Sequence, residues 1–509
     1  MLSLLWKNFD GLLNDNNNQD LESTINDKVF DDLKLRRVLE TIYDTYSESD
    51  EVIEVMSKIP NLDSIEMRRE ILDDFFSSNN ELEKLYYKLQ DLVSRYEAIL
   101  SATERIKKRY LLLFYYYNLF IFLDYVSDFI EINKYKSDRL IAIKNEIDEY
   151  IGNNRAFIEE TNVLYDDLMN VLKLTVEYHD NAPYVTIEND KVNNLEDNLL
   201  EIANLLGIRI EKPTRTLSRK EINAYYLLEI VNSNEKLRDR LFNYYDKNND
   251  EIICLSKYVR ELKYYVMIKL LFEKVCSYGV PKAKCHFNND KTTFKDIYDI
   301  SLVTSKIETI PNDFIISDDE NVQFILGVNS GGKTCYIRSV GINYILALTT
   351  AYVFGKEANV MIMKYINTHF PNEENYKVGD GRLVDEVNRL NIIEKTFCRN
   401  SISFLNETFS STSESKACDL TFQLLDKCKS SNAKVLFVTH QYKIFDELHD
   451  SKIGFYTPQV SEENGNKRTY KIKKVEKKLL SYVSDILIKH GLTKEELMKR
   501  KKIWKVYWI

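Results

Sequence analysis

A glycine-rich segment that follows a short apolar run has the residue types and spacing for binding phosphate groups. Residues 322–326 predict a buried strand. The pattern G-x-x-x-x-G-K-[ST] is matched immediately afterwards by Gly327, Gly332, Lys333 and Thr334. Glycines let backbone N–H groups approach phosphate oxygens, a helix N-terminus attracts negative charge, and a lysine neutralises the outer phosphates. The segment therefore predicts a site for ATP rather than an ordinary glycine-containing turn.

The predicted ATP-binding loop comprises Gly327, Val328, Asn329, Ser330, Gly331, Gly332, Lys333 and Thr334. The hydroxyl of Thr334 stands where a ligand of Mg²⁺ is expected. ATP and Mg²⁺ are thus the predicted cofactors.

A second apolar run, 401–405, ends in two polar residues that could complete this site. Transfer of a phosphoryl group to water needs a group near Mg²⁺ and a group that orients the attacking water. Glu407 could polarise that water, a role worth about 10²- to 10⁴-fold in rate. Asn406 could hold Mg²⁺ through a bound water, but a neutral amide adds no charge, so weaker metal binding and slower turnover are expected. Without the other motifs, these residues could equally end an ordinary strand.

A third apolar run, 433–439, is followed by His440. A histidine at the carboxyl end of a strand can reach a γ-phosphate and respond to its presence. A lone histidine is usually structural, but its place after a core strand favours function. Glu407 and His440 are the predicted catalytic residues.

The elements that must hold these residues alternate between short apolar runs and helical patterns. Such alternation predicts a parallel sheet with crossover helices and a phosphate loop at the carboxyl end of its first strand. The first 280 residues contain little Gly or Pro and repeat apolar residues every three or four positions, which is typical of long helices. The predicted fold class is mixed: an N-terminal all-α lever/core domain followed by an α/β P-loop (ABC-type) ATPase domain.

Gly, Pro, Asn and Lys are concentrated at 278–299, where a domain boundary is expected. The predicted divisions are a helical domain at 1–280, a linker at 281–300 and an ATPase and dimerisation domain with C-terminal helices at 301–509. Residues 82–132 lack Pro and Gly, so one long helix or a barely interrupted pair is expected there. Turn residues and short β-like pieces near 180–221 predict a reduced clamp.

Charge and cysteine content exclude several classes of protein. The formal net charge is −9, so any contact with nucleic acid must come from local basic patches. The seven cysteines form no C-x-x-C pair, which argues against a zinc site or a disulfide framework and fits a reducing cytoplasm. The N-terminus lacks the basic region and cleavage site of a signal peptide. Residues 110–130 are long enough to span a membrane, but Asn118, Asp124 and Asp128 interrupt them, so a buried helix is expected.

Together these motifs resemble the ATPase domain of the MutS family of DNA mismatch-repair and recombination proteins. The family's phosphate loop reads G-P-N-M-G-G-K-S, its second strand ends in D-E-x-G-x-G-T-S, and its third ends in T-H-Y-H-E-L. The corresponding positions here are Gly327, Asn329, Gly331, Gly332, Lys333, residues 406–413, Thr439 and His440. The resemblance covers about 295–500 and extends more weakly into residues 31–43 and 59–72, which look like the start of the family's lever domain.

The resemblance implies further contacts and partners. Residues 310–313 resemble the V-P-N-D segment that enters the family's nucleotide pocket, which implies that Ile310 and Asn312 contact ATP. A homodimer that closes around two nucleotides and moves levers on DNA is also implied. The family's mismatch-reading and connector domains have no counterpart in this sequence. Phe157 and Glu159 have the F-x-E spacing of a mismatch reader, but they lie in a helical pattern without the family's glycines, so we interpret the spacing as chance.

Several positions depart from the family pattern. Asn406 replaces an aspartate, and Phe409 and Ser411 replace glycines. In the motif G-R-S-T-F, whose serine touches the neighbouring subunit's γ-phosphate, Leu383 and Val384 replace the hydroxyl residues. These departures argue against hydrolysis assisted by the second subunit, whereas the intact loop supports nucleotide binding.

Three basic runs, 104–110, 467–478 and 498–508, could contact DNA, but such runs are more often solvated faces. An alternative function is therefore a nucleotide-gated protein-interaction module with weak or no hydrolysis and no DNA role. A transporter ATPase is disfavoured because no membrane partner segment is present in the sequence. No membrane partner is expected.

Overall fold

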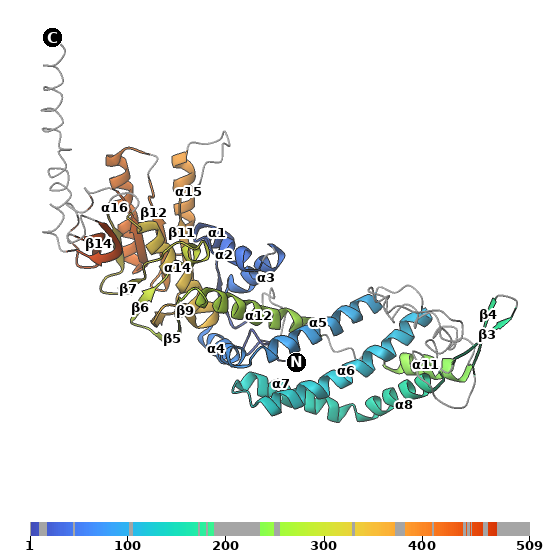
Figure 1. Cartoon of the computed structure of the whole chain (residues 1–509). Helices are drawn as coiled ribbons and strands as arrows, with labels where there is room; N and C mark the ends of the chain where they lie inside the picture. Colours follow the sequence, from blue (N-terminus) through green and yellow to red (C-terminus); the bar gives the residue numbers. More distant parts are fainter. Residues whose placement is uncertain are drawn as a thin grey trace, which may run out of the picture. The chain divides into compact units, whose positions relative to one another are not determined.

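The computed structural model describes residues 2–9, 18–43, 46–100, 105–171, 174–179, 182–187, 235–248, 255–327, 331–371, 382–409, 412–440, 444, 448, 450–461 and 467–475 (Figure 1). The chain forms two compact units. The helical unit comprises Met1–Leu4 and Asp73–Val266, and the sheet unit comprises Leu5–Leu72 and Met267–Ile509. Helices predominate in the N-terminal half and the large sheets lie in the C-terminal half, which confirms the predicted mixed class.

The helical unit is built around one long helix. Its elements are α5 (Glu81–Leu100), α6 (Arg105–Asn133), α7 (Asp138–Asn153), α8 (Arg155–Val171), β3 (Leu174–His179), β4 (Ala182–Ile187) and α11 (Glu235–Asn248). Helix α6 packs against α5, α7, α8 and α11 (Figure 1). The pattern at 82–132 therefore forms a pair of helices. Tyr96 late in α5 lies 4.6 Å from Tyr115 early in α6, measured between ring centroids, so the pair is antiparallel.

Aromatic side chains fill the interior of this unit. Phe157 is 8% exposed and its ring packs against Tyr116, Phe120 and Tyr244. Its F-x-E spacing therefore belongs to a helix with a buried aromatic face. Within the predicted clamp at 180–221, the structure describes only residues 182–187, which form β4 and pair antiparallel with β3. None of the helices that the structure describes combines the length and apolar content that a membrane crossing needs.

The sheet unit begins with an N-terminal segment that the sequence pattern assigned to the helical domain. Its elements are β1 (Leu21–Thr24), α1 (Asp27–Asp32), α2 (Leu35–Tyr43), α3 (Tyr46–Met56), β2 (Lys58–Pro60) and the start of α4 (Leu62–Ser77). Arg68 is fully buried, and its Nε donates to the carbonyl of Leu5 at 3.0 Å while Nη1 donates to the carbonyl of Thr349 at 3.4 Å. These bonds tie the N-terminal segment to the C-terminal half of the chain. The chain passes between the units after Leu4, within α4 and within α12 (Ser256–Cys276).

The expected linker at 281–300 consists mainly of two strands instead. A five-stranded sheet has the order β7-β6-β10-β5-β9, and its strands are β5 (Lys282–Asn288), β6 (Lys291–Ile297), β7 (Asn312–Ser317), β9 (Tyr352–Phe354) and β10 (Glu357–Met361). Some of the polar residues that suggested a linker form the turn between β5 and β6, where Asn288 Oδ1 accepts from the N–H groups of Asp290 and Lys291. The boundary expected at 281–300 is therefore not where the two units divide.

The second large sheet carries the motifs. Its order is β11-β12-β13-β8-β14-β15, with β8 (Val322–Ile325), β11 (Tyr365–His369), β12 (Ser401–Asn406), β13 (Lys434–Val438), β14 (Ile453–Ser461) and β15 (Lys467–Lys474). The first five strands in this order are parallel and β15 is antiparallel to β14. The predicted parallel sheet is confirmed, and the strands expected at 322–326, 401–405 and 433–439 correspond to β8, β12 and β13.

Helices cover both faces of this parallel sheet. Helix α14 (Lys333–Thr350) contacts β12 and β13 as well as β6 and β9 of the five-stranded sheet, so it is buried almost all round. On the other face, Phe324 and Phe437 share a core cluster with Leu424 and Leu425 of α16 (Glu414–Ser431) and with Leu390 of α15 (Arg382–Glu394). The sheet unit also contains the short helix α13 (Ile300–Thr304).

Candidate functional site

The register of three neighbouring strands brings the predicted motifs to one edge of the parallel sheet. Ile325 of β8 pairs with Val438 of β13, and Val438 pairs with Asn406 of β12. Because the strands are parallel, the segments that follow them leave the sheet side by side. The phosphate loop, Glu407 and His440 therefore gather at the carboxyl ends of the strands.

The phosphate loop begins with a glycine whose backbone few other residues could adopt. Gly327 has φ +140°, and a Cβ there would lie 2.9 Å from Cδ of Pro458. Its carbonyl accepts a hydrogen bond of 2.8 Å from Nζ of Lys333. Gly332 caps α14 with φ +88°. Val328, Asn329 and Ser330 lie outside the described residues.

Lys333 occupies a buried position at the N-terminus of α14. It is 4% exposed, and burial lowers the pKa of its ammonium while the nearby Glu407 carboxylate raises it. A cation that has lost most of its hydration gains from an anion brought beside it. The N-terminal N–H groups of α14 attract the same kind of ligand.

Two oxygen atoms are paired where Mg²⁺ is expected. Thr334 Oγ1 donates to Oδ1 of Asn406 at 3.2 Å, and Asn406 is 6% exposed. Hydroxyl and amide oxygens suit Mg²⁺, which usually takes few protein ligands and the rest from water and phosphate. No cluster of three or more His, Cys, Asp or Glu that could hold a metal occurs in the described part of the chain. The donor set therefore fits Mg²⁺ that is held chiefly by a nucleotide.

The two predicted catalytic side chains contact each other. His440 Nε2 lies 3.0 Å from Oε1 of Glu407, and each side chain is 36% exposed. Glu407 has φ +50°, an uncommon conformation for a residue with a side chain, and its N–H donates to the carbonyl of Val438 at 2.8 Å. Both groups are open enough to meet a water molecule or a ligand.

The strand β11 adds a histidine that the sequence motifs did not indicate. His369 ends β11, pairs in register with Leu405 and lies 3.1 Å, through Nδ1, from Oγ1 of Thr408. It is 2% exposed, and burial lowers its pKa to about 3, so the ring is neutral. Its Nε2 has no hydrogen-bond partner among the described residues. The sequence signal was available, since "YINTH" at 365–369 is a short run ending in a polar residue, as in the neighbouring strands.

The antiparallel strand β15 lies against the start of α14. The ring of Tyr470 would be 3.3 Å from a Cβ on Gly332. Asn312 holds this strand, because its Nδ2 donates to the carbonyl of Tyr470 at 3.0 Å and its Oδ1 accepts from the N–H of Ile472 at 2.8 Å. The half-buried Ile310 also accepts from Nδ2 of Asn312, through its carbonyl at 3.3 Å. Asn312 thus links β7 to β15, and its two polar atoms are already engaged.

Comparison with known proteins finds similarity to MutS proteins. The sequence profile of MutS domain V matches residues 323–488. A DNA mismatch repair protein MutS from Clostridioides difficile is 23% identical over 459 residues, which cover 80% of this chain and 47% of that protein. Residues 323–488 therefore belong to the MutS domain V family, and the chain is similar to MutS proteins over much of its length.

Two further MutS relatives extend the comparison. A DNA mismatch repair protein MutS from Clostridium perfringens is 29% identical over 174 residues, covering 33% of this chain and 19% of that protein. An Endonuclease MutS2 from Lactobacillus helveticus is 23% identical over 320 residues, covering 58% of this chain and 36% of that protein. The chain thus spans less than half of the length of each of these three MutS relatives.

The MutS domain V match begins in β8 and extends beyond Val475, the last described residue. It therefore includes the phosphate loop, β12 and β13. Arg382 of the altered MutS motif begins α15, whereas Gly381 lies outside the described residues.

Proposed function

We propose that the chain binds ATP with Mg²⁺ and hydrolyses it at the carboxyl edge of the parallel sheet. The observation that supports this most strongly is the register of β8, β13 and β12, since it aligns Ile325, Val438 and Asn406 and so gathers three loops. A phosphate loop alone could hold an anion without chemistry. A phosphate loop beside an exposed carboxylate and histidine has the groups that hydrolysis requires.

Each residue has a proposed role that follows from its place. Lys333 would exchange its bond with the Gly327 carbonyl for the outer phosphates of ATP. Thr334 would bind Mg²⁺ directly, and Asn406 would bind it through a water. Mg²⁺ on the nucleotide would neutralise charge on the β- and γ-phosphates.

Glu407 would accept a hydrogen bond from the attacking water and then its proton, as the bond from the γ-phosphorus to the β-γ bridging oxygen breaks. The products are ADP and inorganic phosphate. His440, 3.0 Å from Glu407, would donate to a γ-phosphate oxygen or to the carboxylate, and so couple the carboxylate to the presence of nucleotide. This coupling is why we propose both residues as catalytic.

A release assay for inorganic phosphate tests the hydrolysis. The purified chain is expected to turn over ATP in Mg²⁺, to stop in excess chelator, and to stop in the Lys333→Ala variant. ATP turnover by Lys333→Ala at the wild-type rate would contradict the proposal, because it would come from another site or from a contaminant.

We further propose that ATP brings two copies of the chain together and that the helical unit acts on DNA. The support is family membership, together with relatives that are named DNA mismatch repair proteins. Light scattering of the Glu407→Gln variant with and without ATP tests dimerisation. A mass that ATP leaves unchanged at high protein concentration would argue against it.

A second candidate is a nucleotide-gated protein-interaction module without a DNA role. Two features favour it. The basic run at 467–478 is partly neutralised, because Lys471 lies 3.6 Å from Asp296 and Lys474 pairs with Glu320. The metal site also carries the neutral Asn406 where a carboxylate would bind Mg²⁺ more strongly.

Gel-shift experiments with duplex, branched and single-stranded DNA separate the two candidates. Binding that weakens with salt and changes with ATP would support a DNA role. An absence of binding at any salt concentration, on protein that still binds ATP, would support the interaction module.

A further inference from the structure

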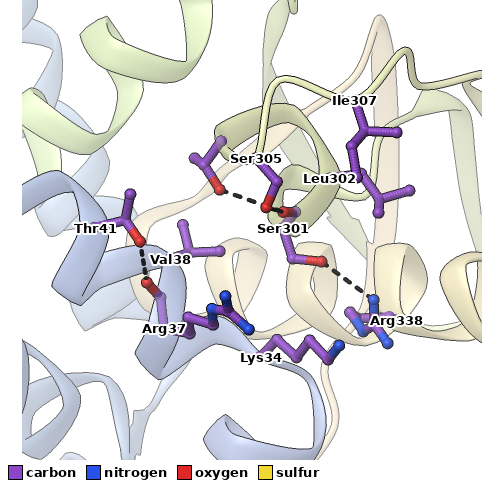
Figure 2. A pocket seen from close by; sticks show the side chains of 10 residues that line it. Lys34, Arg37, Val38, Thr41, Ser301, Leu302, Ser305, Ile307 and Arg338 are labelled. Atoms are coloured by element: carbon purple, nitrogen blue, oxygen red, sulfur yellow. Dashed lines mark hydrogen bonds between the residues drawn. The ribbon is translucent and has the colours of Figure 1, made fainter.

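We propose that the sheet unit has a second anion site, which binds a phosphate group in a pocket that the residues of the phosphate loop do not line. The pocket has a volume of about 150 Å³ and lies between α2, α13 and α14 (Figure 2). A water molecule occupies about 30 Å³ in the liquid, so the pocket has room for a small oxyanion with some water. Its lining residues are Lys34, Arg37, Val38, Thr41, Ser301, Leu302, Thr304, Ser305, Ile307 and Arg338.

Three cations converge on this pocket. Figure 2 shows the side chains of Lys34 and Arg37 extending from the α2 segment toward the same space that Arg338 of α14 reaches. None of the ten residues that line the pocket is acidic. Lys34 and Arg37 make no side-chain ion pair with any other residue in the described part of the chain. Like charges held together at one place destabilise each other unless an anion joins them.

The buried guanidinium of Arg338 has a donor that lacks an acceptor among the described residues. It is only 6% exposed, and its Nη1 donates to Oδ2 of Asp299 at 3.1 Å and to Oγ of Ser301 at 3.2 Å. Its Nε has no hydrogen-bond partner among the described residues. A buried N–H without an acceptor costs free energy. An oxyanion in the pocket would supply that acceptor.

Asp299 does not cancel the charge of the whole cluster. Its carboxylate is 3% exposed and also accepts from the N–H of Ser301 at 3.0 Å and from the Ser301 hydroxyl at 2.7 Å. These bonds fix it at the N-terminus of α13, where it pairs with Arg338 alone of the three cations. The pocket therefore keeps a surplus of positive charge from Lys34 and Arg37.

The hydroxyl groups of the pocket favour a charged ligand over a neutral polar one. Thr41, Thr304 and Ser305 each donate to a backbone carbonyl of their own helix or loop, with distances of 2.8, 2.9 and 2.8 Å. Their protons are therefore already engaged in hydrogen bonds, so the three cationic side chains would bind the ligand. Guanidinium groups match the tetrahedral oxygens of phosphate through paired N–H bonds. A phosphate dianion also matches the surplus charge better than a carboxylate does.

An occupant would link the N-terminal segment to the helix of the phosphate loop. Lys34 precedes α2, whereas Arg338 lies in α14, which starts at Lys333. A phosphate group held by both would join two elements that are distant in sequence. The ligand is either free inorganic phosphate or the phosphoryl group of a small phosphorylated molecule.

Calorimetry without Mg²⁺ tests this site separately from the nucleotide site. All proteins carry Lys333→Ala, which disables the phosphate loop, and the probes are inorganic phosphate and glycerol phosphate. Three proteins are compared: Lys333→Ala alone, the same chain with Lys34→Met and Arg37→Gln, and the same chain with Lys306→Gln. Lys306 is an exposed lysine between two lining residues that does not itself line the pocket.

The Lys333→Ala protein and the Lys306→Gln control are expected to bind phosphate, with an affinity that falls as the NaCl concentration rises. The protein with Lys34→Met and Arg37→Gln is expected to bind phosphate at least about tenfold more weakly than these two proteins. Binding of both probes would identify a phosphoryl-group site, and binding of inorganic phosphate alone would identify a free-ion site. Thermal melting of each variant checks that it is folded. Equal affinity in the Lys34→Met, Arg37→Gln protein, or no binding by a cooperatively melting Lys333→Ala protein, would overturn the proposal.

Discussion

Thr334 Oγ1 donates a hydrogen bond of 3.2 Å to Oδ1 of Asn406, which joins the first turn of α14 to the end of β12. This bond places the hydroxyl of the phosphate loop and the amide of the second strand around one position. Because the amide carries no charge, we expect the pair to attract Mg²⁺ less than a pair with a carboxylate would. We therefore expect the proposed nucleotide site to bind Mg²⁺ more weakly than a site with a carboxylate at this position.

Asn406→Asp is expected to lower the Mg²⁺ concentration for half-maximal ATP hydrolysis by about tenfold, because hydrogen bonds to an ionised group are roughly twice as strong as neutral ones. The rate at saturating Mg²⁺ should rise as well. A magnesium titration of phosphate release measures both quantities. Asn359→Asp, at an exposed position on β10, is the matched control and should change neither. An unchanged or higher magnesium requirement in Asn406→Asp would count against the proposed role.

Glu407→Gln is expected to reduce ATP hydrolysis by about 10²- to 10⁴-fold while ATP affinity changes little. The amide oxygen of glutamine can still bond to His440, so the local contact survives and only the proton acceptor is lost. Single-turnover hydrolysis and equilibrium binding measured on the same preparation distinguish the two effects. Glu357→Gln, an exposed change on β10, serves as the control. Hydrolysis at the wild-type rate in Glu407→Gln would remove the carboxylate from the chemistry.

Asn312→Ala is expected to release β15 from β7, because it removes the bonds of the side chain to Tyr470 and Ile472. Leaving these backbone groups without partners should cost about 1–3 kcal/mol of unfolding free energy. Hydrogen exchange gives the local readout, since the N–H of Ile472 should exchange faster. Asn359→Ala, which removes only a surface bond to Thr293, should leave Ile472 protected. Unchanged protection at Ile472 in Asn312→Ala would show that the side chain does not hold the strand.

Because of His369, the unfolding free energy of the chain is expected to decrease as the pH falls below the ordinary pKa of histidine. Burial lowers its pKa to about 3 from 6.5, so the folded chain keeps the ring neutral while the unfolded chain takes up a proton below about pH 6.5. The unfolded state then binds more protons, and the stability from this group is lost as pH falls through that window. Between pH 7 and pH 5 the loss should be on the order of 2 kcal/mol.

Denaturant unfolding of wild type and His369→Asn at the two pH values measures this effect. Asparagine can still bond to Thr408, but it does not titrate. The variant should therefore lose about 2 kcal/mol less than wild type between pH 7 and pH 5. Parallel losses in both proteins would mean that His369 titrates normally.

The strands that carry the candidate nucleotide site could be predicted because their signals are local. Residues 322–326 and 433–439 are largely apolar because β8 and β13 are central strands, and Gly332, Lys333 and Thr334 are adjacent in sequence. The strand β11 was missed because it is an edge strand. Its polar Asn367 and Thr368 weaken the apolar pattern, and the partner of His369 is Thr408, which is remote in sequence.

The division of the chain into units could not be predicted for a different reason. Residues 5–72 have the same helical periodicity as the helices that follow them. Their place in the sheet unit depends on long-range contacts such as the bond from Arg68 to the carbonyl of Thr349. Likewise, the bonds of Asn312 to β15 could not be predicted, because they join strands of two different sheets that are far apart in the sequence.

Titration calorimetry with ATP and Mg²⁺ on wild type, Lys333→Ala and Lys306→Ala tests the central claim most directly. Wild type and the exposed Lys306→Ala control should bind ATP alike, and Lys333→Ala should bind at least about thirtyfold more weakly, which corresponds to about 2 kcal/mol for a lost bond to a charged group. Equal binding by Lys333→Ala, or no binding of ATP by folded wild-type protein, would contradict the account.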